Sequence, residues 1–211
     1  MGIFDSLRSA LGISAETDAT RAAAPEDLFG MSTAYMTMQA DLGYEPTGEA
    51  ALCFSNVDST SFAETMDEVE AILEAGEIET GTKARFAGDS HGYQWVVLED
   101  DDFEDLVTTV HFAADTFVEQ GFGSRLLAAL FSFEKSATGP GSGPAAAGQV
   151  VYWVYSFRRG AFYPFAPSGG HDRDSSAEFK LESVLEGELE VENEKEYWYP
   201  LWPEGDGRPW G

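Results

Sequence analysis

Basic side chains are scarce in this chain of 211 residues. It has 12 lysines and arginines against 38 aspartates and glutamates, and its formal net charge is −26. The chain has no basic stripe that could neutralise phosphates, so we expect no nucleic-acid partner. Carboxylates spread over every segment are typical of adaptation to high salt, where screening shortens charge repulsion and hydrated carboxylates keep a surface soluble. We therefore interpret the acidic runs, such as residues 186–196, as solvated faces.

Cysteine and long apolar runs are equally rare. Cys53 is the one cysteine, so no internal disulfide can form, and its apolar neighbours predict a buried side chain rather than a nucleophile. No stretch approaches the roughly 20 apolar residues of a membrane span, and the N-terminus lacks the basic flank and apolar core of a signal peptide. These absences predict a cytoplasmic protein.

Recognisable catalytic motifs are also missing. The three histidines form no H-E-x-x-H motif or Cys/His cluster, and the glycine-rich segments lack the lysine of a P-loop. His171, Asp172 and Asp174 could supply metal ligands, but two carboxylates carry almost no information in a chain this acidic. We therefore expect a protein that is not an enzyme and has no catalytic residue, no metal and no cofactor.

What is present divides the chain into three parts. The first, residues 1–13, is expected to form a short amphipathic helix, because its apolar side chains share one helical face: Ile3, Phe4, Leu7 and Leu11. This helix would pack on the body of the protein or, alternatively, make peripheral contact with a membrane through residues 3–13. Residues 14–24 are small and polar and predict a linker. Residues 25–211 are long enough for a single domain with its own core.

Hydrophobic periodicity predicts the elements of this domain. Spacing of three and four residues predicts helices over residues 25–42, 61–75, 103–120 and 175–185, with Ser61 and Ser175 opening capping boxes. Alternation and short apolar runs predict strands over residues 50–55, 83–86, 93–98, 126–133, 150–157 and 162–165. Because the strands come in hairpin-like pairs, we expect an α+β fold with a mostly antiparallel sheet packed with helices. The aromatic C-terminal tail, at residues 197–203, should pack back on the body.

Three of the scarce arginines gather with aromatic rings in residues 155–174. The candidate binding residues in this segment are Arg158, Arg159, Gly160, Phe162, Tyr163, Phe165, Arg173 and Asp174. Arginine can form bidentate bonds to a carboxylate or phosphate, so one hypothesis is a regulatory domain that binds an anionic small molecule here.

The competing hypothesis for these arginines is structural. They would pair with local acids such as Asp172 and Asp174 and stack on Phe162 or Tyr163. We prefer it, because arginine needs no ligand to find a carboxylate in this chain. At least two of the three rings Phe162, Tyr163 and Phe165 should then be buried, with the Tyr163 hydroxyl bonded to a polar group.

Several segments, taken in order, resemble the PspA-associated protein family called PspAB. They are residues 1–5, 45–48, 51–54, 93–97, 121–123, 126–127, 159–167 and 173–174, of which R-G-x-F-Y-P-F-A-P at Arg159–Pro167 is the most specific. The acidic composition suits a haloarchaeal type of member. Members of that family are associated with PspA, a membrane-remodelling protein of the envelope-stress response, and with the membrane metalloprotease HtpX.

The resemblance implies a function without chemistry of its own. It supplies no catalytic residues to carry over, and it implies a non-enzymatic adaptor with PspA-type or HtpX-type partners. The order of helices and strands from residue 61 to residue 186 is also similar to the type III secretion chaperone-like fold, in which an α+β domain offers a sheet face to a partner. That second likeness is an analogy at the level of the fold.

Overall fold

The computed structural model describes residues 22–140, 147–202 and 207–210. The predicted helix at 1–13 and most of the predicted linker at 14–24 lie outside these residues. At the end of the linker, Ala24 is already buried. Ala23, half-buried, also packs against the core, so the end of the predicted linker already belongs to the body of the protein.

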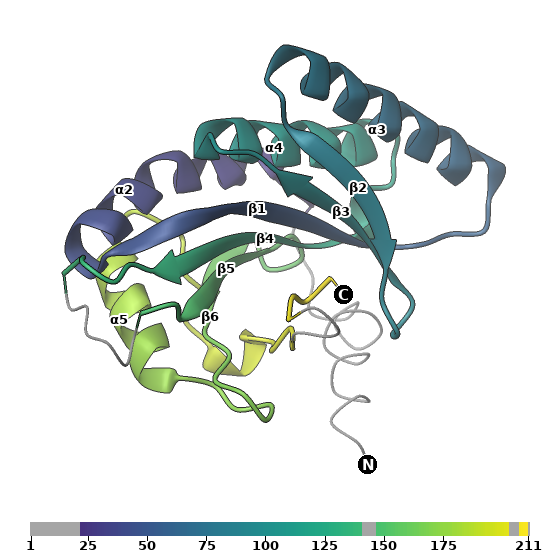
Figure 1. Ribbon diagram of the computed structural model, residues 1–211. Coiled ribbons are helices and arrows are strands. Elements are labelled where there is room, and N and C mark those ends of the chain that lie inside the picture. Colours follow the sequence, from purple (N-terminus) through teal and green to yellow (C-terminus); the bar gives the residue numbers. More distant parts are fainter. Residues whose placement is uncertain (1–21, 141–146, 203–206, 211) are drawn as a thin grey trace.

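Six strands form one antiparallel sheet in the order β2-β3-β1-β4-β5-β6 (Figure 1). The strands are β1 (Tyr44–Ser55), β2 (Lys83–Gly88), β3 (Tyr93–Glu99), β4 (Leu126–Lys135), β5 (Val150–Ser156) and β6 (Ala161–Phe165). The long strand β1 lies at the centre and pairs with β3 on one side and β4 on the other. The predicted α+β fold with an antiparallel sheet is confirmed.

The four helices occur where their spacing predicts them, but the one predicted over residues 25–42 is an α-helix only from residue 31, and the one predicted over residues 61–75 continues to residue 79. They are α2 (Met31–Leu42), α3 (Thr60–Glu79), α4 (Phe103–Glu119) and α5 (Ser175–Leu185), with 3-10 turns η2 (Pro25–Gly30), η3 (Gly123–Arg125) and η4 (Lys195–Tyr197). The predicted caps of two helices are wrong by one or two residues. The Ser59 hydroxyl, not that of Ser61, accepts the N–H of Phe62 in the first turn of α3, and Asp174, not Ser175, caps α5. In both cases the side chain of the residue just before the helix accepts a backbone N–H of the first turn.

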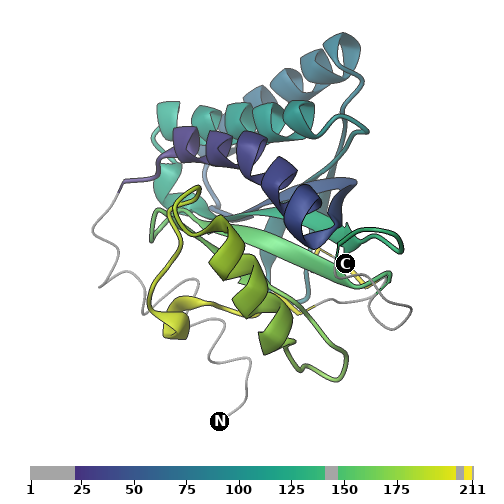
Figure 2. The same cartoon turned by 90° about the vertical axis from the view of Figure 1, so that its left-hand side faces the viewer.

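The helices cover one face of the sheet. Figure 1 and Figure 2 show α2, α3 and α4 lying across it, with α5 beside α2 at the β6 end. One hydrophobic core joins all four helices to the sheet side chains of this face, among them Leu52, Phe131 and Trp153. No described helix combines the length and apolar character needed to cross a bilayer.

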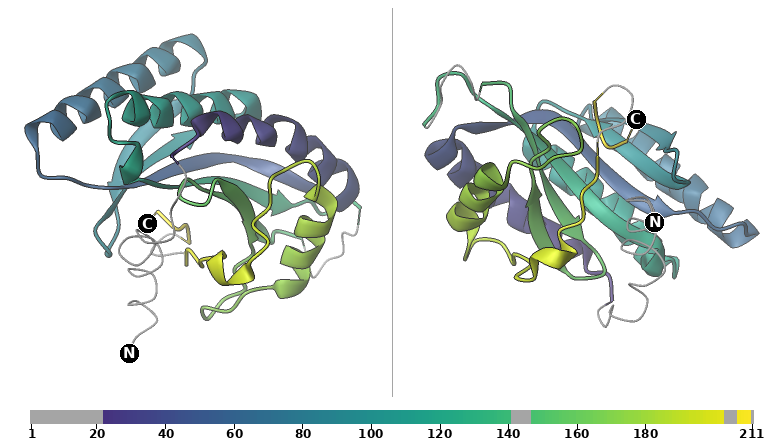
Figure 3. Two further views of the ribbon diagram at one scale, coloured as in Figure 1. Left: turned by 180° about the vertical axis from the view of Figure 1, so that it is seen from behind. Right: turned by 90° about the horizontal axis from the view of Figure 1, so that it is seen from below.

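The opposite face of the sheet is covered by the C-terminal tail, a name that from here on means the chain that follows α5. The part of the tail that the structure describes crosses this face as an irregular segment whose one helical element is the short turn η4 (Figure 3). Trp198, Leu201 and Trp210 are buried there against a second core of sheet residues. The prediction that the aromatic tail packs back is therefore confirmed. Cys53 lies in this second core, is fully buried as predicted, and has its thiol pKa raised by that burial.

Candidate functional site

The arginine-aromatic segment begins in the turn between β5 and β6. Gly160 has a positive φ of 63°, and the backbone N–H groups of Arg159 and Gly160 both donate to the Ser156 carbonyl, at 3.1 and 2.7 Å. This left-handed conformation is one that glycine adopts easily and other residues resist. The turn sets Arg158 and Arg159 just ahead of β6, the strand at the edge of the sheet.

Gly160→Ala should lower the free energy of unfolding by about 1–2 kcal/mol, because a Cβ is unfavourable at this φ. Gly76→Ala is the matched control. Gly76 lies inside α3, where an added Cβ meets nothing within 4 Å, so the change should instead stabilise by up to about 1 kcal/mol. Chemical denaturation of both variants measures this. A Gly160→Ala variant as stable as the wild type would contradict the conformational argument.

Arg159 is held by acidic and aromatic side chains of the tail. Its Nε donates to Glu192 Oε2 at 2.6 Å, and an Nη atom lies 3.7 Å from Glu194 Oε1. Its guanidinium stands 3.8 Å from the centre of the Tyr197 ring. The Glu192 side chain is 8% exposed, so this ion pair is largely shielded from water.

The local bonds set the charge state of Glu192. Burial opposes its ionisation, but the hydrogen bond from Arg159 and a backbone N–H of Glu194 outweigh burial and hold the pKa of Glu192 below its ordinary value. The same hydrogen bond raises the pKa of Arg159. The pair is therefore ionised near neutral pH and ties the β5–β6 turn to the tail.

Arg173 joins three other parts of the domain. Its Nε donates to Glu178 Oε1 on α5 at 2.8 Å, one Nη donates to the Trp198 carbonyl of the tail at 2.5 Å, and the other donates to the Pro164 carbonyl of β6 at 3.2 Å. Its guanidinium also lies 5.2 Å from the Phe165 ring. Glu178 is buried, and the same Oε1 accepts the backbone N–H of Ala166 at 2.9 Å.

Asp174, next in the chain, serves a different purpose. Its Oδ1 accepts the N–H groups of Ser176 and Ala177 at the start of α5, and its Oδ2 accepts the amide of Gln149 at 2.9 Å. These bonds, the one from Ala177 above all, hold the pKa of Asp174 below its ordinary value. Asp174 is thus a helix cap, whereas the sequence suggested it as an ion-pair partner of the arginines.

Glu192 and Glu178, rather than the suggested Asp172 and Asp174, are the ion-pair partners of Arg159 and Arg173. Sequence reasoning missed both glutamates. Glu192 falls in the run 186–196, interpreted as a solvated face, yet it is 7% exposed. Glu178 stood at the glutamate position of the predicted capping box. The β-bridge between Phe162 and Val191 explains why Glu192 is buried, because it brings the tail alongside β6.

The three aromatic rings of the segment are buried, as predicted. Phe162 packs into the core on the helical face, while Tyr163 and Phe165 point to the opposite face, under the tail. The Tyr163 hydroxyl donates to the Tyr199 carbonyl at 3.1 Å, and burial raises the pKa of Tyr163. Because side chains alternate along β6, this one short strand packs against both the helical layer and the tail.

Arg158 does not join the other two arginines. It is half-buried, and its Nε meets no hydrogen-bond partner among the described residues. Arg159 and Arg173, in contrast, both bind the tail, at Glu192 and Trp198 respectively. These two residues are neighbours in space, since the Trp198 indole N–H donates to the Glu192 carbonyl at 2.8 Å. We call this arrangement of Arg159, Arg173 and the tail segment 192–198 the arginine clamp.

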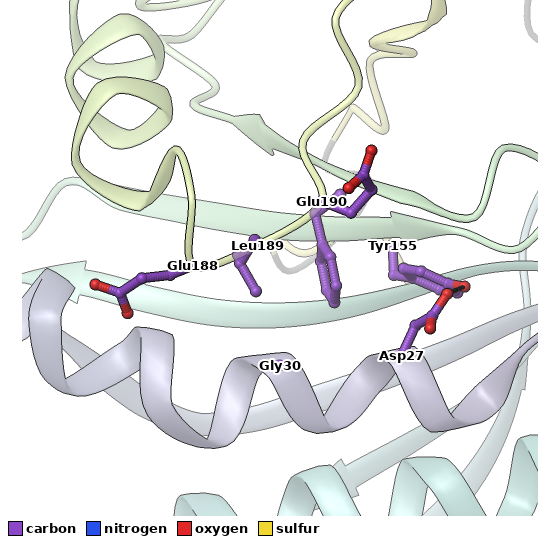
Figure 4. A pocket seen from close by; sticks show the side chains of 7 residues that line it. Asp27, Gly30, Tyr155, Glu188, Leu189 and Glu190 are labelled. Atoms are coloured by element: carbon purple, nitrogen blue, oxygen red, sulfur yellow. Dashed lines mark hydrogen bonds between the residues drawn. The ribbon is translucent and has the colours of Figure 1, made fainter.

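A pocket of about 280 Å³ lies on the helical side, between η2 and the start of the tail (Figure 4). Its lining consists of Asp27, Gly30, Tyr155, Phe162, Glu188, Leu189 and Glu190. The Tyr155 hydroxyl donates to Asp27 Oδ2 at 2.9 Å, whereas the carboxylates of Glu188 and Glu190 point away from Asp27 (Figure 4). Among the described residues, the lining holds carboxylates and no cation, which does not suit the anionic ligand that the sequence suggested.

The histidines occupy separate places. His91 lies in the β2–β3 turn, His111 on α4 beside Phe29, and His171 after β6 with a positive φ of 64°. Among the described residues, no group of three or more His, Cys, Asp or Glu side chains could hold a metal ion. The suggested set of His171, Asp172 and Asp174 is therefore not assembled.

Comparison with known proteins adds the family. Residues 1–210 match the family described as PspAB, PspA associated protein B. No protein of curated function matches the chain, and no solved structure matches it. The likeness to the type III secretion chaperone-like fold therefore stays a prediction. Since the match spans the chain from residue 1 to residue 210, the protein belongs to the PspA associated protein B family.

Proposed function

We propose that the protein is a non-enzymatic adaptor that binds a PspA-type protein of the membrane-stress response. The observation that carries this proposal is the family match over residues 1–210, whose name gives the association with PspA. An HtpX-type membrane protease is the second proposed partner, from the resemblance of the sequence. We place the action of the adaptor in the cytoplasm, next to the membrane on which such partners work.

The geometry of the arginine clamp favours this proposal over a regulatory domain for an anionic ligand. Arg159 and Arg173 each donate to a glutamate that is less than 10% exposed. An anion would have to displace these carboxylates, and it would leave them buried without their cations. The pocket of Figure 4 is not lined by Arg158, Arg159 or Arg173.

The proposal is tested by affinity capture with the full chain, in buffer of high salt. The purified, tagged protein is mixed with an extract of source cells, and PspA and HtpX are sought by name among the retained proteins. An unrelated protein of similar net charge serves as the control for capture by charge alone. We expect PspA to be retained by the tagged protein and not by the control. Retention of neither PspA nor HtpX, under conditions in which a known Psp complex survives, would overturn the proposal.

A further inference from the structure

A groove of about 360 Å³ lies between α3 and α4, on the helical layer and away from the arginine clamp. The α3 side of its lining consists of Ile72, Ala75, Gly76, Glu79 and Thr80. The α4 side consists of Asp105, Thr108, Thr109, Phe112, Asp115, Thr116 and Glu119. The Phe112 side chain is 53% exposed, so an apolar wall of this groove faces solvent.

Gly76 gives the groove its depth. It lies in the last turn of α3, and within a helix glycine is less favourable than alanine by up to about 1 kcal/mol. An added Cβ at Gly76 would meet nothing within 4 Å, and Gly76 is not among the glycines with a positive φ. Neither the packing nor the conformation of the chain requires glycine here. Its effect is to let another side chain approach the α3 backbone.

The charge around the groove has a single sign. α3 carries seven acidic side chains and α4 four, and neither helix carries a lysine or an arginine. Four carboxylates lie in the groove lining itself, at Glu79, Asp105, Asp115 and Glu119. Burial and the nearby charges of Asp102 and Asp100 raise the pKa of Asp105 above its ordinary value. Positive groups placed at these positions would relieve that repulsion.

We propose that the groove between α3 and α4 is the docking site for an amphipathic helix of a partner protein, with an apolar stripe and lysine or arginine on its flanks. The apolar stripe would fill the space over Gly76 beside Phe112, and the flanking cations would face the carboxylates of the two rims. This is the helix-in-groove mode of recognition. The inference rests on the proposed function for its partner, a PspA-type protein.

The size of the groove fits such an occupant. At the helical rise of 1.5 Å per residue, its α4 side from Asp105 to Glu119 is about 20 Å long and its α3 side from Ile72 to Thr80 about 12 Å, so a docked helix would follow α4 for about four turns and meet both walls over about two. In high salt, screening weakens the attraction at the rims, whereas some salts strengthen apolar burial. The apolar stripe therefore supplies most of the affinity, and the rim charges select and orient the helix.

The first test blocks the groove. Gly76→Phe places a ring in the open space, and Ala63→Phe, an exposed site more than three turns away on the same helix, is the matched control. Binding of a purified PspA-type protein to the full chain is measured by titration. We expect Gly76→Phe to weaken binding at least tenfold and Ala63→Phe to change it less than twofold. Phe112→Ala, which removes the apolar wall, is a second variant that does not depend on tolerance at Gly76, and it should also weaken binding several-fold.

The second test uses a defined probe. An 18-residue synthetic peptide carries leucine at positions i, i+3, i+4 and i+7 and lysine on the flanks, and a second peptide carries glutamate on the flanks. The wild-type protein should bind the lysine peptide more tightly than the glutamate peptide, and Gly76→Phe should reduce binding of the lysine peptide at least tenfold. Equal binding of the lysine peptide by wild type and Gly76→Phe would show attraction by charge elsewhere on the surface and would overturn the proposal.

The two arms separate this inference from the proposed function. If Gly76→Phe captures the PspA-type protein as well as the wild type does, the docking site in the groove is refuted and the proposed adaptor function is not. If Gly76→Phe abolishes binding of the lysine peptide but the wild type does not bind PspA, the docking site in the groove is supported and the assignment of its partner is refuted.

A photo-reactive phenylalanine analogue at position 112 should crosslink to the PspA-type protein. Crosslinks to residues 1–13 of the same chain, or to a second copy, would overturn the inference.

Discussion

The Arg173→Ala variant is expected to unfold at a temperature lower by about 10 °C, through a loss of about 3–5 kcal/mol in the free energy of unfolding. Arg173 donates to Glu178, to the Trp198 carbonyl and to the Pro164 carbonyl, so its loss releases α5, the tail and β6 from one another. The Glu178 side chain, 6% exposed, would keep a buried charge without its cation. Thermal unfolding at neutral pH measures the effect.

Two further variants show whether geometry or charge causes this loss. Arg173→Lys keeps the charge but lacks the planar fork that reaches three acceptors, so it should restore only part of the stability. Arg125→Ala removes an arginine that is exposed on η3, and it should change the unfolding temperature little. If Arg125→Ala and Arg173→Ala had equal effects, the loss would reflect net charge, and the clamp at Arg173 would not be structural.

Arg159→Ala is expected to cost on the order of 3 kcal/mol at neutral pH, with no ligand present. The variant loses the 2.6 Å bond to Glu192 and the contact with the Tyr197 ring. Arg158→Ala is the matched control in the same turn, since the Arg158 Nε has no hydrogen-bond partner among the described residues, and it should cost less than about 1 kcal/mol. If Arg159→Ala melts like the wild type while a stabilisation by phosphate disappears, Arg159 is a binding residue and the clamp assignment is wrong.

The effect of Arg159→Ala should depend on pH. Arg159 helps to hold the pKa of Glu192 below its ordinary value of 4.5 in the folded protein. A carboxyl group with a lowered pKa stabilises the fold above its unfolded pKa, and this contribution is lost as the pH falls through the folded pKa. The difference in stability between wild type and Arg159→Ala should therefore be largest near neutral pH and should shrink below about pH 4. A difference that stays constant down to pH 3 would exclude the ion pair as its cause.

The predicted elements agree with the structure because their signals are local. Helical spacing in residues 103–120 matches α4, and the alternation at residues 93–98 matches β3. The errors lie where two local signals compete. Ser175 and Glu178 form a plausible capping box, but Asp174 caps α5 and Glu178 turns inward to Arg173. A capping pattern in the sequence cannot show that one of its residues, here Glu178, will instead form an ion pair with a residue outside the helix.

The groove between α3 and α4 was not predictable in the same way. The helix predicted over residues 61–75 stops just before Gly76, because glycine commonly terminates helices. In the structure, α3 continues to Glu79 and Gly76 lies within it. Beyond Gly76 the last turn is closed by hydrogen bonds, since the N–H and the hydroxyl of Thr80 both donate to the Gly76 carbonyl. Only the tertiary packing of α3 beside α4 makes this glycine part of a groove.

By itself, the sequence determined the approximate positions of the helices and strands, the α+β class, the burial of Cys53 and of the aromatic tail, and membership of the PspAB family, but it missed the first half of β1, which begins at Tyr44 and not at residue 50. Only the tertiary structure decided what the arginines do. Arg159 meets a glutamate 33 residues away, and Arg173 meets a tail carbonyl 25 residues away. In a chain with 38 acidic residues, charge alone gives an arginine no preferred partner. The choice follows from the tail running beside β6, which buries Glu192 and so makes one carboxylate among many the one that needs a cation.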